Sequence, residues 1–127
     1  MIVAVSNATG ETALSGGPDE YTGFANALDA RSGTITLDVD ADVTPYDRAL
    51  SAIVIRERDL GAVTVSVEND QLIIAGSRRP LAVLADIVRD SAVSGDPDGH
   101  VHIEYFPGHE YLSEGSVPLV IADAVQR

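Results

Sequence analysis

The residues with the clearest metal-ligand character form the pattern His100-x-His102-x-Glu104 in the last third of the chain. Alternate residues of a β-strand point to the same face, so these three side chains are expected to project together if residues 100–106 form a strand. Two imidazoles and a carboxylate are donors found in zinc and non-haem iron sites. The same pattern is typical of a solvated sheet face, and we prefer that interpretation, so no metal is assigned.

A second acidic pattern consists of Asp38, Asp40 and Asp42 and resembles the start of a calcium-binding loop. Such a loop requires Gly at its sixth position and Glu at its twelfth. Counted from Asp38, these positions hold Val43 and Ala49. The pattern therefore indicates an exposed, charged strand end.

The sequence lacks the motifs of common catalytic sites. It contains no Cys, which excludes thiol catalysis, and it has no Gly-x-Ser-x-Gly elbow, Walker loop or dinucleotide fingerprint. Gly16 and Gly17 precede an expected helix, but Asp19 and Glu20 at its start would repel a phosphate. We therefore expect a protein that is not an enzyme and that has no cofactor.

Residues 105–112 hold three of the six Tyr and Phe residues of the chain, grouped around a Pro-Gly pair. Aromatic side chains beside acidic ones are typical of protein-binding hot spots. The alternative is that Tyr105 and Phe106 belong to the core and that Pro-Gly is only a turn. The partner-binding residues expected in and around this segment are His102, Glu104, His109, Glu110, Tyr111 and Glu114.

The charge balance restricts the class of partner. Eight Arg, no Lys and twenty Asp and Glu give the 127 residues a net charge of -12. Nucleic acids and anionic membranes bind clustered cations, so neither is an expected partner. A basic protein is expected instead, because opposite charge speeds its capture. No oligomeric state is predicted.

Length and hydropathy favour one cytoplasmic domain over residues 1–127. Single domains commonly run from about 100 to 150 residues, and a chain of this length needs no disulfide or metal to stabilise its core. No apolar run approaches the roughly 20 residues of a membrane span. The first residues have no basic leader, which argues against a secretory signal.

Apolar periodicity predicts an α+β fold with a mostly antiparallel sheet and two helices on one face. Helices are expected from Pro18 to near Gly33 and after Pro80, where apolar residues recur at spacings of three and four. Residues 48–59 fit either a strand or a helix, and Pro118 suggests either an edge strand or the start of a strand. The expected strands are residues 2–6, 12–15, 34–39, 52–55, 62–68, 71–75, 100–106 and 117–121, and residues 94–99 are expected to form a loop.

The order of these elements suggests two repeated hairpin-helix-hairpin units, residues 1–60 and 61–124. An offset of 60 places Leu14 on Ile74, Gly16 on Gly76, Phe24 on Leu84 and Leu28 on Val88. After the helix the offset becomes 66, which places Ile35 on Val101, Leu37 on Ile103 and residues 53–55 on 119–121. Identities are few, so the alternative is that a small α+β chain alternates its elements in this way by chance.

Residues 100–121 resemble the C-terminal signature of the bacterial family called immunity protein 32. The resemblance rests on the block His100 to His109, then Tyr111-Leu112, then the block Gly115 to Ile121, and it extends over residues 63–121. It implies an α+β, non-enzymatic, cytosolic protein of a polymorphic toxin system, which binds a cognate toxin and occludes it. The strong negative charge further suggests a nuclease toxin, whose cleft must be positive to hold a polyanion.

Two other functions remain open at this point. An acidic adaptor or regulatory domain would also bind a basic protein partner. A metal-dependent enzyme would use His100, His102 and Glu104, and it would retain a transition metal on purification.

Overall fold

The computed structural model describes residues 1–94, 96 and 98–124. In this part of the chain the helices are α1 (Pro18–Ala30) and α2 (Arg78–Val93). The strands are β1 (Ile2–Val5), β2 (Thr12–Ser15), β3 (Ser32–Thr36), β4 (Arg48–Ala49), β5 (Ala52–Glu57), β6 (Thr64–Glu68), β7 (Gln71–Gly76), β8 (His100–Ile103) and β9 (Leu119–Ala122).

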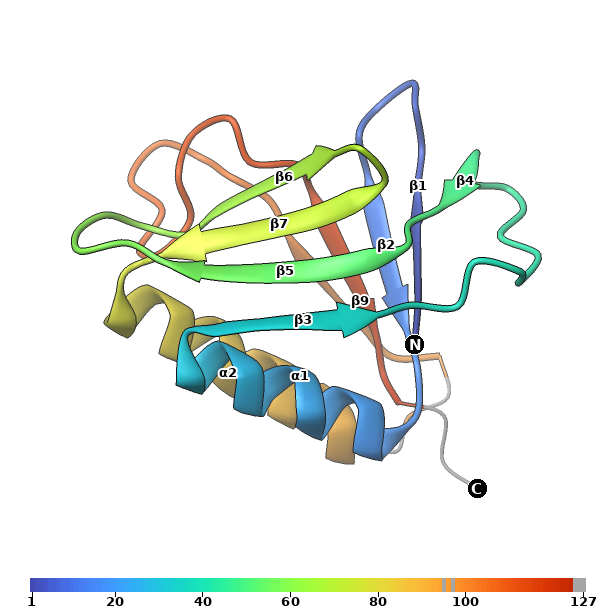
Figure 1. Ribbon diagram of the computed structural model, residues 1–127, viewed down its shortest axis with the longest axis horizontal. Coiled ribbons are helices and arrows are strands. Elements are labelled where there is room, and N and C mark those ends of the chain that lie inside the picture. Colours follow the sequence, from blue (N-terminus) through green and yellow to red (C-terminus); the bar gives the residue numbers. More distant parts are fainter. Residues whose placement is uncertain (95, 97, 125–127) are drawn as a thin grey trace.

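The strands form two sheets. Sheet A has the order β4-β1-β2-β9-β8 and sheet B the order β3-β5-β7-β6. In Figure 1 the strands of sheet B run across the picture, those of sheet A run steeply behind and beside them, and the two helices lie together below sheet B. The expected α+β class is confirmed, and the strand pairs are antiparallel except for β2–β9 and β5–β7.

Each sheet combines the first hairpin of one half of the chain with two later strands of the other half: β1 and β2 with β8 and β9 in sheet A, and β6 and β7 with β3 and β5 in sheet B. The short strand β4 is added to the edge of sheet A. The parallel pairs that join the halves have matching registers: Leu14 pairs with Ile121 in sheet A, and Ile74 pairs with Ile55 in sheet B. Adding 60 to the number of Leu14 and subtracting 66 from that of Ile121 gives the second pair. Apart from β4, the two sheets therefore have the same strand order, and the offsets suggested by the sequence pattern relate their parallel pairs.

The register of β8 differs from the one expected by two residues. Ile35 of β3 lies opposite Ile53, and the corresponding residue opposite Leu119 is Ile103. The sequence comparison places Val101 there instead. Both Val101 and Ile103 fit the apolar alternation, so the pattern fixes the face of the strand and leaves its register open.

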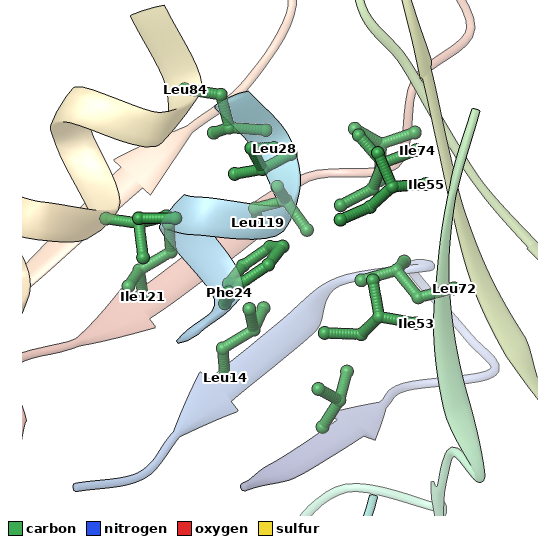
Figure 2. Packing of buried hydrophobic residues seen from close by; sticks show 14 of the residues in the cluster. Leu14, Phe24, Leu28, Ile53, Ile55, Leu72, Ile74, Leu84, Leu119 and Ile121 are labelled. Atoms are coloured by element: carbon green, nitrogen blue, oxygen red, sulfur yellow. The ribbon is translucent and has the colours of Figure 1, made fainter. Parts of the chain in front are cut away.

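The core lies between the inner faces of the two sheets and the helix pair. Phe24 and Leu28 of α1 are buried, and their counterparts Leu84 and Val88 of α2 are buried as well. Figure 2 shows Leu14 and Leu119 of sheet A near the ring of Phe24, with the isoleucines of sheet B facing them. The apolar stripe that predicts each helix is thus the stripe that packs into the core.

Both helices begin after a strand that ends in glycine or small residues. The N-cap residues Gly17 and Ser77 have nearly the same extended conformation, with ψ of 170° in each case. In α1, the Glu20 side chain accepts a hydrogen bond from the Gly17 N–H at 3.0 Å. Space is tight at Gly76, because a Cβ there would lie 3.1 Å from the Cα of Val63.

Several element boundaries differ from those expected. The strand predicted at residues 34–39 is β3, two residues earlier, and residues 48–59 contain strands β4 and β5 and no helix. Pro118 directly precedes β9, which lies inside sheet A and not at an edge. Strand β8 ends at Ile103, so residues 104–106 fall outside the strand expected there. In the predicted 94–99 loop, Gly95 and Pro97 lie outside the described residues.

Neither helix in the described part of the chain is both long and apolar enough to cross a membrane.

Tyr21 joins α1 to sheet A through its hydroxyl. The side chain is fully buried, and its O–H donates to the carbonyl oxygens of Leu14, at 3.2 Å, and of Ala122. Tyr21→Phe leaves these buried oxygens without that donor, so we expect the free energy of unfolding at pH 7 to fall by about 1–3 kcal/mol. Urea denaturation followed by circular dichroism measures the loss.

The same variant has a predicted alkaline signature. Burial raises the pKa of Tyr21, and the nearby charges of Asp123 and Glu20 raise it further. The unfolded chain therefore releases this proton first, so stability that is present below about pH 10 declines as the pH rises further. The stability of Tyr21→Phe should decline less steeply above pH 10 than that of the wild type. Equal slopes for Tyr21→Phe and the wild type would contradict this assignment.

Candidate functional site

His100 and His102 lie on the outer face of sheet A. Their side chains are exposed, and the two imidazole rings meet edge to face with centroids 4.8 Å apart. They share this face because Val101 and Ile103 alternate with them and point toward the core. Glu104 follows the last residue of β8. In the described part of the chain no three His, Asp or Glu side chains come together as a group that could hold a metal ion.

His102 and Glu104 line an open pocket of about 480 Å³ at the end of sheet A. Its lining residues come from the end of β8, the start of β9, the β1–β2 turn and the connection between β3 and β4. The other lining residues are Ser6, Thr9, Glu11, Pro45, Tyr46, Ile103, Pro118 and Leu119. The pocket thus brings together segments that are far apart in the sequence, and two of the predicted partner-binding residues, His102 and Glu104, line it.

Tyr46 and Glu11 form the polar wall of this pocket. The Tyr46 O–H donates a hydrogen bond to Oε2 of Glu11 at 2.8 Å. This bond links the segment between β3 and β4 to the β1–β2 turn. Partial burial raises the pKa of Tyr46, and the hydrogen bond to Glu11 contributes to the shift. Sequence analysis missed both residues. The only available indication was that Tyr46 is the one aromatic residue in a polar, Pro-containing segment.

His109 is the centre of a small aromatic cluster on the β8–β9 connection. Its ring lies 4.8 Å from that of Phe106 and 4.5 Å from that of Tyr111, centroid to centroid. Its Nδ1 accepts hydrogen bonds from the backbone N–H groups of Leu112, at 3.0 Å, and Tyr111, at 3.3 Å. Phe106 is 58% exposed, so an aromatic face is presented to solvent.

The β8–β9 connection is held against the edge of sheet B. The Val63 N–H donates to the Tyr111 carbonyl at 2.7 Å, the Ser113 N–H donates back to Val63 at 2.7 Å, and the Val117 N–H donates to Val65 at 2.9 Å. These bonds satisfy backbone groups at and before β6, an edge strand that would otherwise be open to pairing. The aromatic cluster is therefore presented by a fixed backbone.

The predicted contact residues thus fall into two groups. His102 and Glu104 belong to the pocket on sheet A. His109 and Tyr111 belong to the aromatic cluster, where burial raises the pKa of Tyr111 and the charge of Glu110 adds to it. Glu110 and Glu114 are exposed on the same connection.

The acidic residues 38, 40 and 42 have a structural explanation. The Asp38 carboxylate accepts the N–H of Asp40 at 2.9 Å. The Asp42 carboxylate accepts the Thr44 N–H at 3.0 Å and its hydroxyl at 2.7 Å, and these bonds hold the pKa of Asp42 below its usual value. Short polar side chains that bond the backbone two residues on are typical of turns. This agrees with the failure of the calcium-loop pattern.

Comparison with known proteins gives one family. The sequence model of the family described as Immunity protein 32 matches residues 71–124, which confirms the resemblance seen in the sequence. The matched segment runs from β7 through α2 and β8 to the end of β9, so it includes the β8–β9 connection. No curated protein and no solved structure gives a significant match.

Proposed function

From the match of residues 71–124 to immunity protein 32, we propose that this chain is an immunity protein that binds and neutralises a cognate bacterial toxin. It acts in the cytoplasm as a stoichiometric inhibitor without turnover. The family match carries the proposal. The net charge of -12 and the exposed aromatic ring of Phe106 support it, because protein inhibitors combine charge that speeds capture with aromatic contacts that slow release.

The charge also favours a class of toxin. A nuclease must hold a polyanion, so its catalytic cleft is positive, and an acidic protein can occupy that cleft without copying the chemistry of the substrate. We therefore propose a toxin with a basic active-site surface, such as a nuclease. Association should then be fast at low salt and slower as ionic strength rises.

A survival assay tests this function. The open reading frame next to the source gene is expressed in a test bacterium with and without this chain, and colonies are counted. We expect the neighbour to kill, the chain to restore growth, and calorimetry to give one-to-one binding that a chelator leaves unchanged. An empty vector and an inactive toxin variant serve as controls. A harmless neighbour, or killing that the chain does not prevent, would overturn the proposal and favour an acidic adaptor.

A further inference from the structure

The outer face of sheet A carries a row of small apolar residues, most of them partly exposed. Residues that pair directly across neighbouring strands point to the same face. One such row crosses all five strands: Ala49 opposite Ala4, Ala4 opposite Ala13, Ala13 opposite Val120, and Val120 opposite His102. Three alanines and a valine make a flat floor, and the row ends in an exposed imidazole.

The corresponding row of sheet B is more polar. There Thr34 lies opposite Val54, Val54 opposite Ile73, and Ile73 opposite Ser66. Hydroxyl side chains thus occupy the two edge strands of sheet B, whereas β1 and β2 of sheet A carry alanine at this level. Because the four strands compared have the same order in both sheets, this difference lies in the side chains.

The connection between β3 and β4 makes this floor into a groove with two pockets. Besides the pocket that holds His102 and Glu104, a smaller pocket of about 190 Å³ lies over Ala13, Val120 and Ala122. Tyr46 lines both pockets, so its side chain stands between them. The hydrogen bond from Tyr46 to Glu11 fixes this partition.

The carboxylates that line the groove give it negative charge. Glu11 and Glu104 line the larger pocket, and Asp42 lines the smaller one. No Arg is among the lining residues of either pocket. A groove with acidic walls and an apolar floor fits a cationic side chain whose neighbour in the sequence is apolar.

We propose that this groove is where a basic segment of the cognate toxin docks. An Arg or Lys side chain enters the larger pocket, where Glu11 and Glu104 neutralise it, and an apolar side chain covers Ala13 and Val120 in the smaller one. This inference rests on the proposed toxin-neutralising function and assigns that function to one face of the molecule. Tyr46 acts as a positioning residue that holds the Glu11 carboxylate at the pocket wall.

Charge-neutral variants test the groove in the survival and binding assays. In Glu11→Gln the amide oxygen can still accept the Tyr46 hydroxyl, so the variant removes charge and keeps the wall. The double variant Glu11→Gln, Glu104→Gln should weaken toxin binding at least tenfold. Its matched control is Glu68→Gln combined with Glu57→Gln, which removes two exposed carboxylates from sheet B and should bind within about twofold of the wild type.

A steric variant tests the apolar floor. Ala13→Arg places a long cation in the groove and should lower toxin affinity about a hundredfold, because it combines a clash with like-charge repulsion. Ser66→Arg puts the same side chain on the outer face of sheet B and should bind normally. Thermal melting must show each variant folded. If Ala13→Arg does not fold, the charge-neutral pair still decides the question.

The outcomes separate the two proposals. If the wild type protects and the groove variants protect and bind equally well, the groove assignment is wrong and the immunity function stands. If the wild type itself fails to protect, the function fails. A toxin-independent arm uses the blocked dipeptide Arg-Leu and its citrulline-Leu analogue in an NMR titration. We expect shifts at Glu11, Tyr46 and Glu104 with the arginine peptide alone, and shifts spread evenly over all acidic residues would overturn the groove.

Discussion

Fragments 1–60 and 61–127 are each expected to be unfolded in isolation. Each sheet takes two or three strands from one half of the chain and two from the other, so separation leaves only hairpins with small additions. Isolated hairpins are marginally stable at best, and a chain of about 60 residues buries only about 60% of its unfolded surface. Separation also exposes the faces that α1 and α2 turn to each other. We therefore propose that the two halves form one cooperative domain.

Far-UV circular dichroism and proton NMR of the separate fragments measure this directly. Dispersed amide signals and a cooperative melt should appear for the intact chain and be absent for each half. The matched control carries a protease site inserted in the exposed loop at residues 58–61 and is cut there after folding, so that both halves remain together. A cooperative melt of either fragment alone, as a monomer or as a dimer, would show that one half suffices for a stable core.

Phe24→Ala should lower the free energy of unfolding by about 3–5 kcal/mol. Phe24 is 1% exposed and, with Tyr21, is one of the two largest side chains that α1 places in the core. Removing the ring loses the free energy gained by burying its apolar surface, and it leaves a cavity that the surrounding residues fill only in part. Small domains have only about 5–15 kcal/mol in total, so the variant stands near the limit of folding.

Urea denaturation gives the size of this effect. The midpoint should fall at an unchanged dependence on urea concentration, since the amount of surface exposed on unfolding stays similar. Leu60→Ala is the control, because Leu60 is 87% exposed and its truncation should change stability by less than about 0.5 kcal/mol. A loss below about 1 kcal/mol for Phe24→Ala would mean that the helix does not anchor both sheets.

The segment that resembles the family signature, residues 100–121, contributes to both the groove and the aromatic cluster. The signature begins at His100, and β8 places His102 in the groove on sheet A. It then continues into the connection that brings Phe106 and His109 against the edge of sheet B. If the toxin contacts only one of these two surfaces, variants on that surface will weaken toxin binding and variants on the other will not. Measuring the affinity of variants on both surfaces therefore maps the interface.

The candidate site was only partly predictable from the sequence. The pattern of exposed residues that alternate with Val101 and Ile103 identified His102 as a surface residue of a strand. Tyr46 and Glu11 were not predicted, because each lies in a polar connection without periodicity. They meet only because the β3–β4 connection crosses to sheet A and adds β4 beside β1. Local patterns contain no information about which distant connection covers a sheet.

The sequence by itself determined the elements and their faces. Apolar spacing gave α1 and α2, strict alternation gave strands such as β6, and Asn69-Asp70 marked a tight turn in which both residues have positive φ. The tertiary structure alone decided that the strands form two sheets, that β2 and β9 pair in parallel, and that Ile103 rather than Val101 lies opposite Leu119. The physical reason is the two-residue period of a strand: it fixes which side chains face the core, and a shift of two residues leaves those faces unchanged. Partner and register are therefore chosen by the packing of the whole core.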